Sequence, residues 1–95
     1  MRIGVVIGTV VATRKCESMV GNKLLLTQPV NIKREAIGEP FVAVDAVGAG
    51  VGDFILFATG TASRNSVQKP KSSIDASIIG IIDNVDIHPE VLEDK

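Results

Sequence analysis

The chain has 95 residues and a mass of 10.0 kDa, which suits one small domain. Apolar residues make up 45% of it and aromatic residues only 3%, while ten basic residues nearly balance eleven acidic ones. This composition is too apolar for a disordered chain. The single cysteine excludes an internal disulfide framework, and no run of about 18 apolar residues is present to span a membrane.

Five segments are typical of β-strands because they are rich in β-branched residues and bounded by Gly, Pro or Asn. In chain order they are residues 2–13, 23–30, 41–47, 54–59 and 76–85. Gly4 and Gly8 share one face of the first strand, which predicts a bulge, a sharp bend or a close approach of two backbones. Helix is scarce: residues 61–65 can form one turn, and the tail after Pro89 is too short to be a stable helix alone.

Two segments, 31–39 and 64–73, are polar enough to be loops, and we expect 64–73 to be flexible because it is basic and contains Pro70. Five short strands with irregular connections predict a single all-β domain over residues 1–95. Its expected architecture is a small five-stranded OB-like β-barrel with at most one short helical turn.

The predicted strands are apolar on both faces, although a barrel of this size has only one interior. We assign Val6 and Val10 of the first strand to the outside. The last strand contains the run 78–82, which would promote aggregation if it were left exposed. We therefore predict a homo-oligomer, with Val6, Val10, Ile79 and Ile81 at the subunit interface.

The residues that most often perform chemistry lack suitable partners in this sequence. His88 has no second ligand or nucleophile at a useful spacing, so we expect it at the surface. Cys16 follows two basic residues, but no histidine lies near it, and we interpret it as an incidental thiol. Asp45 lies in an apolar strand, where we expect it to anchor a loop by hydrogen bonds. We therefore expect no enzyme activity, no cofactor and no metal.

The segment 48–52 reads Gly-Ala-Gly-Val-Gly and superficially resembles a dinucleotide-binding turn. That turn must open a helix, whereas here a strand follows at 54–59. Two interpretations remain: a strand connection with positive φ angles, or a point where the backbones of several chains meet.

Five segments form a more specific pattern when they are taken in their order and spacing: 7–15, 21–26, 42–53, 60–64 and 74–83. Together they resemble the vertex-protein family of bacterial microcompartments, the EutN/CcmL type. The chain has Gly-Thr-Ala-Ser-Arg at 60–64 where the family usually has Gly-Ser-Ser-Ala-Arg, so a role tied to one serine does not carry over. The C-terminal tail, 87–95, falls in a variable part of the family.

The resemblance implies an OB-like barrel that assembles as a homopentamer in the shell of a bacterial microcompartment, within the cytoplasm. Such pentamers occupy the five-fold corners of polyhedral shells that are otherwise built from hexameric proteins, which would be the partners. The residues implied at the five-fold axis are Gly48, Ala49, Gly50, Val51 and Gly52. Those implied at the edge contacts with hexamers are Thr13, Arg14 and Lys15.

Two other functions stay open at this point. One is an OB-type nucleic-acid module, which the balanced charge and the absence of Tyr and Trp disfavour. The other is a free-standing ring that acts as a scaffold in the cytoplasm. We expect neither a nucleic-acid nor a membrane partner.

Overall fold

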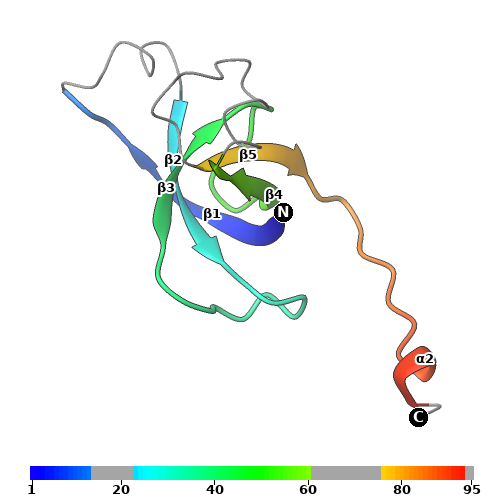
Figure 1. Cartoon of the computed structure of the whole chain (residues 1–95). Helices are drawn as coiled ribbons and strands as arrows, with labels where there is room; N and C mark the ends of the chain where they lie inside the picture. The colour runs from blue at the N-terminus through cyan, green and yellow to red at the C-terminus, as the bar shows by residue number, and fades with distance from the viewer. Residues whose placement is uncertain (14–22, 61–75, 94–95) are drawn as a thin grey trace.

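Five strands close into one barrel in the computed structural model, which describes residues 1–13, 23–60 and 76–93 (Figure 1). The described elements are β1 (Arg2–Val10), β2 (Lys23–Pro29), β3 (Phe41–Asp45), β4 (Phe54–Thr59), β5 (Ala76–Ile81) and α2 (Glu90–Glu93). The strand order around the barrel is β1-β2-β3-β5-β4. The β3–β5 pair is parallel, joins only Val44 and Asp45 to β5, and is the shortest of the five pairings. The other four pairs are antiparallel.

All five predicted strands are confirmed, but β2 ends one residue earlier than expected, at Pro29, and three others end at least two residues earlier. β1 ends at Val10, which lies opposite Leu24 at the beginning of β2. β3 ends at Asp45, because its side chain binds the next backbone N–H groups. β5 runs antiparallel to β4 and ends at Ile81, which lies opposite Ile55, the second residue of β4. Beyond Ile81 the chain has passed the start of β4 and has no described strand to pair with.

The predicted helical turn at 61–65 and the predicted loop at 64–73 lie outside the described residues. The tail departs from expectation in a small way, since it does form one helical turn, α2. Two backbone hydrogen bonds hold this turn: the N–H of Val91 donates to the carbonyl of His88, and the N–H of Leu92 donates to the carbonyl of Pro89. No helix in the described parts of the chain is long and apolar enough to cross a membrane.

The barrel interior is filled by aliphatic side chains and Phe57. The largest continuous core cluster consists of Val6, Leu25, Ala43, Ala49, Ile55, Phe57, Ala76 and Ile78. Gly4 confirms the expected close approach, because a Cβ there would lie 2.9 Å from the carbonyl oxygen of Gln28 and 3.1 Å from Cγ2 of Thr27. The expected bulge is also present, since the β1–β2 register shifts between Val6 and Gly8.

The prediction that Val6 faces outward is wrong. Val6 is 1% exposed and belongs to the core cluster, on the same side of β1 as Gly4. Gly4 must face inward because only a residue without a side chain fits against β2. The alternation of the strand therefore places Val6 inside and Ile3, Val5 and Ile7 on the other face.

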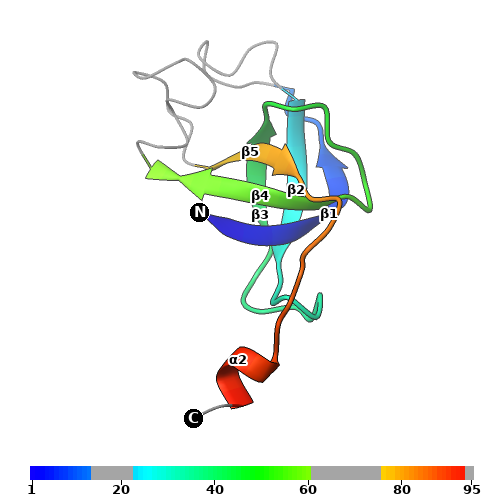
Figure 2. The same cartoon turned by 90° about the vertical axis from the view of Figure 1, so that its right-hand side faces the viewer.

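After β5 the chain leaves the barrel as a C-terminal arm, residues 82–93, which ends in α2 (Figures 1 and 2). The arm points away from the barrel in both views, and the longest axis of the molecule is 52 Å against 24 and 22 Å for the other two. The arm therefore projects away from the compact barrel.

Candidate functional site: surfaces for assembly

Asp45 fixes the start of the glycine-rich loop that joins β3 to β4. Its Oδ1 accepts hydrogen bonds from the backbone N–H groups of Val47, Gly48 and Ala49 at 3.0, 3.1 and 3.1 Å. Its side chain is 3% exposed, and Oδ2 lies 3.6 Å from Nζ of Lys23. The buried carboxylate thus finds the donors it needs, and the prediction that Asp45 anchors a loop is confirmed.

The other end of the loop is held in the same way. Oδ2 of Asp53 accepts from the N–H of Gly50 at 2.8 Å, and the N–H of Asp53 donates to the carbonyl of Gly50 at 3.0 Å. The N–H of Gly52 donates to the carbonyl of Val6 at 2.8 Å. The Nζ of Lys23 donates to the carbonyl of Ala49. Both ends of the loop are therefore attached to the barrel.

Two glycines of the loop adopt the left-handed conformation, with φ +82° at Gly48 and +93° at Gly52. This confirms the expected positive φ angles in a strand connection. Gly50 has no such constraint, and a Cβ there would have only Oδ2 of Asp53 nearby, at 4.0 Å. The single chain therefore requires glycine at positions 48 and 52 but gives no reason for glycine at position 50.

The loop does not present all of its predicted residues to solvent. Ala49 is 0% exposed and is part of the barrel core, so its methyl group cannot line an opening between subunits. Val51 is 63% exposed and lies at the tip. Of the two non-glycine residues implied at the five-fold axis, only Val51 is therefore exposed enough to face a neighbouring subunit.

The outer face of the barrel is apolar, as the two-sided strands predicted. Ile7 and Ile81 are 46% and 42% exposed, and Ile79 is half-buried. Val10 is also half-buried and packs partly against Leu24 and Val44. Several exposed or half-buried apolar side chains close together on one face commonly mark an interaction surface.

Sequence reasoning missed further members of this face. Ile3 lies opposite Leu56 in the β1–β4 pair, and both side chains are half-buried. Gly80 lies opposite Leu56 in the β4–β5 pair, where an added Cβ would lie 3.5 Å from Cδ1 of Leu56. The alternation of side chains along β1 places Ile3 and Ile7 on one face and Gly4 and Val6 on the other. The alternation alone does not show which face points into the barrel.

Of the three residues implied at shell edges, the structure describes one. Thr13 is exposed just beyond the end of β1, while Arg14, Lys15 and also Cys16 lie outside the described residues. His88 is exposed on the arm, with its two ring nitrogens 3.4 Å from Asp86 and 3.3 Å from Glu90. This confirms its expected surface position.

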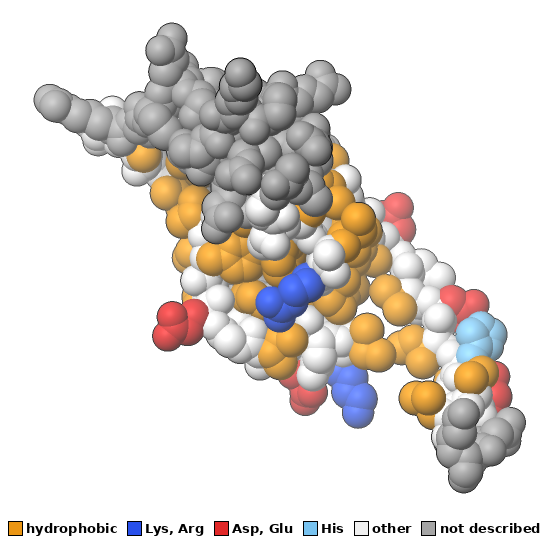
Figure 3. All heavy atoms as spheres, viewed as in Figure 1, with side chains coloured by type: hydrophobic (Ala, Val, Ile, Leu, Met, Phe, Trp, Pro, Cys, Tyr) orange, Lys and Arg blue, Asp and Glu red, His pale blue; other side chains and the backbone are white. Residues whose placement is uncertain are grey.

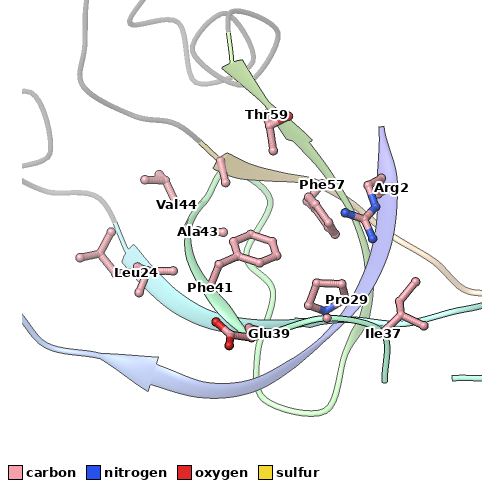
Figure 4. A pocket seen from close by; sticks show the side chains of 13 residues that line it. Arg2, Leu24, Pro29, Ile37, Glu39, Phe41, Ala43, Val44, Phe57 and Thr59 are labelled. Atoms are coloured by element: carbon pink, nitrogen blue, oxygen red, sulfur yellow. The ribbon is translucent and has the colours of Figure 1, made fainter. Parts of the chain in front are cut away.

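A cavity of about 620 Å³ opens at the barrel wall beside Phe41 and Phe57 (Figure 4). The two rings are 4.7 Å apart between centroids, and the Arg2 guanidinium lies 5.7 Å from the Phe57 ring centroid. Glu39 lies on another part of the rim (Figure 4). We call this the Phe41–Phe57 cavity. Sequence reasoning missed it because its walls come from five segments that are distant in the chain.

The space-filling view shows how charge and apolar groups are distributed (Figure 3). Hydrophobic side chains cover much of the visible barrel, with isolated basic and acidic groups between them. The arm carries hydrophobic side chains next to acidic ones and the single histidine. Among the described residues on this face, the basic side chains form no continuous surface of the kind that tracks a nucleic-acid backbone.

A family model described as "Ethanolamine utilisation protein EutN/carboxysome" matches residues 1–83. The chain belongs to the EutN/CcmL family. The family suggested by the ordered sequence segments is therefore confirmed, and so is the small barrel that it implied.

Relatives in the EutN/CcmL family match over nearly their whole length. The bacterial microcompartment shell vertex protein GrpN of Rhodospirillum rubrum (strain F11) is 44% identical over 86 residues, which cover 90% of this chain and 97% of that protein. The carboxysome shell vertex protein CcmL of Gloeobacter violaceus is 42% identical over 95 residues, which cover 100% of this chain and 95% of that protein.

Solved structures of the family have the same fold. The pentameric microcompartment shell protein GrpN from Rhodospirillum rubrum is similar with a TM-score of 0.84 and 41% identity, over 93% of this chain and 100% of that chain. An ethanolamine utilization protein, EutN, is similar with a TM-score of 0.87 and 31% identity, over 92% and 91% of the two chains.

Proposed function

We propose that this chain is a structural shell protein that forms the pentameric vertices of a polyhedral bacterial microcompartment. One observation carries the proposal. Relatives named as shell vertex proteins match 90% to 100% of this chain and 95% to 97% of their own length. The proposed place of the protein is therefore the compartment shell, within the cytoplasm, and its role requires no catalysis.

The proposed mechanism is geometric. A flat sheet of hexamers has six-fold symmetry everywhere and cannot close on itself, whereas a five-fold unit at each corner introduces curvature. A five-membered ring forms when one surface of a subunit binds a different surface of the next and the rotation closes. The subunit must therefore carry two complementary assembly surfaces and a point where five copies meet.

We assign the meeting point to the loop of Gly48, Ala49, Gly50, Val51 and Gly52. Its attachment by Asp45 and Asp53 supports this, because a ring centre needs a loop with one defined conformation. Glycine at position 50 also supports it. The single chain does not require glycine there, whereas close approach of five backbones would.

The apolar outer face supplies the proposed subunit interface. Of the four residues predicted at this interface, Val10, Ile79 and Ile81 remain in the proposal, because they are half-buried or exposed in the single chain. We add Ile3 and Ile7 for the same reason. Burial of such side chains against a neighbour stabilises association by about 25 cal/mol for each Å² removed from water. Val6 has no part in it.

For the contacts with hexameric shell proteins we propose Thr13, Arg14 and Lys15. The exposure of Thr13 beyond the end of β1 supports this, and the two basic residues directly follow it in the chain. Contacts between separately folded rings are expected to be more polar than the interface within a ring.

The test is co-expression with a hexameric shell protein of the same type of compartment, followed by electron microscopy of the assemblies. We expect closed polyhedra with this chain and open sheets or tubes without it. The double variant Arg14→Glu/Lys15→Glu should remain pentameric but enter shells less efficiently. Shells that close equally well without the chain would contradict the vertex role.

A further inference from the structure

The C-terminal arm has little contact with its own barrel. The N–H of Ile82 donates to the carbonyl of Phe54 at 2.8 Å, and the described backbone hydrogen bonds beyond it stay within residues 88–92 of the arm. Four apolar side chains of the arm are 41%, 52%, 62% and 76% exposed, in the order Val85, Ile87, Val91 and Leu92. An arm ordered in this way loses conformational entropy without burying its apolar groups, unless another surface covers them.

The arm is long enough to cross a neighbouring subunit. The eight residues 82–89 span at most about 26–29 Å when extended. The two shorter axes of the whole molecule are 24 and 22 Å. In Figures 1 and 2 the arm also points away from its own barrel, so it is directed toward a position outside the subunit.

The Phe41–Phe57 cavity is the matching surface on the barrel. Its walls are mainly apolar and include Pro29, Ile37 and Val42 beside the two rings. Its volume, about 620 Å³, lies within the range of about 300–1,000 Å³ in which protein cavities bury most of a bound group. It can therefore receive several aliphatic side chains.

We propose that the arm of one subunit packs into the Phe41–Phe57 cavity of the next subunit around the ring, an inference that rests on the proposed pentamer. A closed ring needs two different surfaces that complement one another, and the arm and the cavity are such a pair. The apolar side chains of the arm are exposed, and so are Ile37 and Val42 among the residues that line the cavity, as expected of surfaces that meet only between copies.

The charges of the arm and of the cavity rim favour the same contact and indicate which side of the cavity the arm follows. The arm contains four acidic residues, Asp83, Asp86, Glu90 and Glu93, but no Lys or Arg. Arg2 lies at the cavity and takes part in no ion pair among the described residues, so it can receive an acidic group. Glu39, elsewhere on the rim, repels the acidic side of the arm and so favours a path on the Arg2 side.

Disulfide trapping in the full-length chain tests this contact. In a Cys16→Ser background, Leu92→Cys is combined with Val42→Cys, which is 47% exposed and lines the cavity. The matched control combines Leu92→Cys with Val47→Cys, a valine 40% exposed that does not line the cavity. After oxidation, we expect the first pair to form a ladder of covalent oligomers up to five subunits, and the control pair to form little or none.

Equal ladders from both pairs, no ladder, or a disulfide within one subunit would overturn the arm contact. A second measurement uses Ile87→Ser/Leu92→Ser, with Ile32→Ser as the control at another exposed site. We expect the double variant to raise the subunit concentration at which the ring half-dissociates by at least about tenfold, since one buried aliphatic side chain accounts for that factor. An unchanged concentration would also overturn the contact.

These results separate the two proposals. If the wild-type chain is pentameric but shows no ladder with Val42→Cys, the arm inference fails and the vertex function stands. If the wild-type chain is a monomer at micromolar concentration, the vertex function fails and the arm inference fails with it.

Discussion

The glycine-rich loop and the C-terminal arm are both connections without regular strand structure, but they differ in what holds them. The loop is attached at both ends by carboxylates, Asp45 and Asp53, and it directs Ala49 into the core. Among the described residues, the arm has one backbone hydrogen bond to the barrel, from Ile82, and its apolar side chains are exposed. The loop conformation is therefore encoded within one chain, whereas the arm conformation depends on a neighbour.

This contrast separates two kinds of assembly surface. A point where five copies meet must have a fixed shape before the copies arrive, because any disorder there would have to be removed five times. A contact that joins neighbours around the ring can be an extended segment that becomes ordered on binding. Substitutions of the loop anchors and of its positive-φ glycines should therefore act on folding, whereas substitutions in the arm should act on association.

The largest expected effect is that of Asp45→Ala. It removes the acceptor of three backbone N–H groups, of which that of Ala49 is partly buried and the other two are exposed, so the free energy of unfolding should fall by about 2 kcal/mol. Urea unfolding at a fixed subunit concentration measures it. Asp45→Asn is the control, because its amide oxygen can still accept, and it should lose less than half as much. Equal losses for the two variants would contradict the anchoring role.

A smaller effect is expected at the positive φ positions of the same loop. Gly48→Ala should lower the free energy of unfolding by about 1 kcal/mol, because a side chain is strained at φ +82° even though the space around it is open. The control is Gly50→Ala, which meets no such strain. Thermal unfolding of both variants shows the difference, and equal melting temperatures would contradict the account.

Gly50→Leu should change folding by less than about 0.5 kcal/mol within one chain, since a Cβ there has open space apart from Asp53 at 4.0 Å. Its effect should instead appear in assembly, because five leucines would crowd the ring centre. Native mass spectrometry should show weakened or incomplete rings from a chain whose circular dichroism is unchanged. If this variant assembled and closed shells normally, the assignment of the five-fold axis would be wrong.

The smallest expected effect on folding is that of Leu92→Ser in the arm. The side chain is 76% exposed in the single chain, so the free energy of unfolding of an isolated subunit should change by less than about 0.5 kcal/mol. Hydrogen exchange of dilute protein measures it. A clear loss of protection in the barrel would mean that the arm packs on its own subunit.

Much of the fold could be predicted because its signals are local. Runs of β-branched residues bounded by Gly, Pro and Asn gave the five strands, and an isolated carboxylate in an apolar strand gave the anchoring role of Asp45. β5 ends at Ile81 because its partner β4 begins at Phe54, which the pattern of β5 alone does not contain. β3 ends at Asp45 because its carboxylate binds N–H groups just after it, and the apolar pattern does not distinguish such a residue from one inside the strand.

The direction of each apolar face could not be predicted from one strand. Val6 and Ile7 are equally apolar, and the choice between them depends on Gly4, which has room only for a hydrogen against Gln28 and Thr27. Ala49 belongs to the core for a similar reason, since the loop folds back over the barrel. The Phe41–Phe57 cavity combines residues from distant segments and appears only once the barrel is closed.

Light scattering or native mass spectrometry of the 95-residue chain at micromolar concentration determines whether it forms the proposed ring. We expect a complex of five copies of the 10.0 kDa chain. A sharply monomeric mass, or a ring with a different number of subunits, would contradict the proposed assembly.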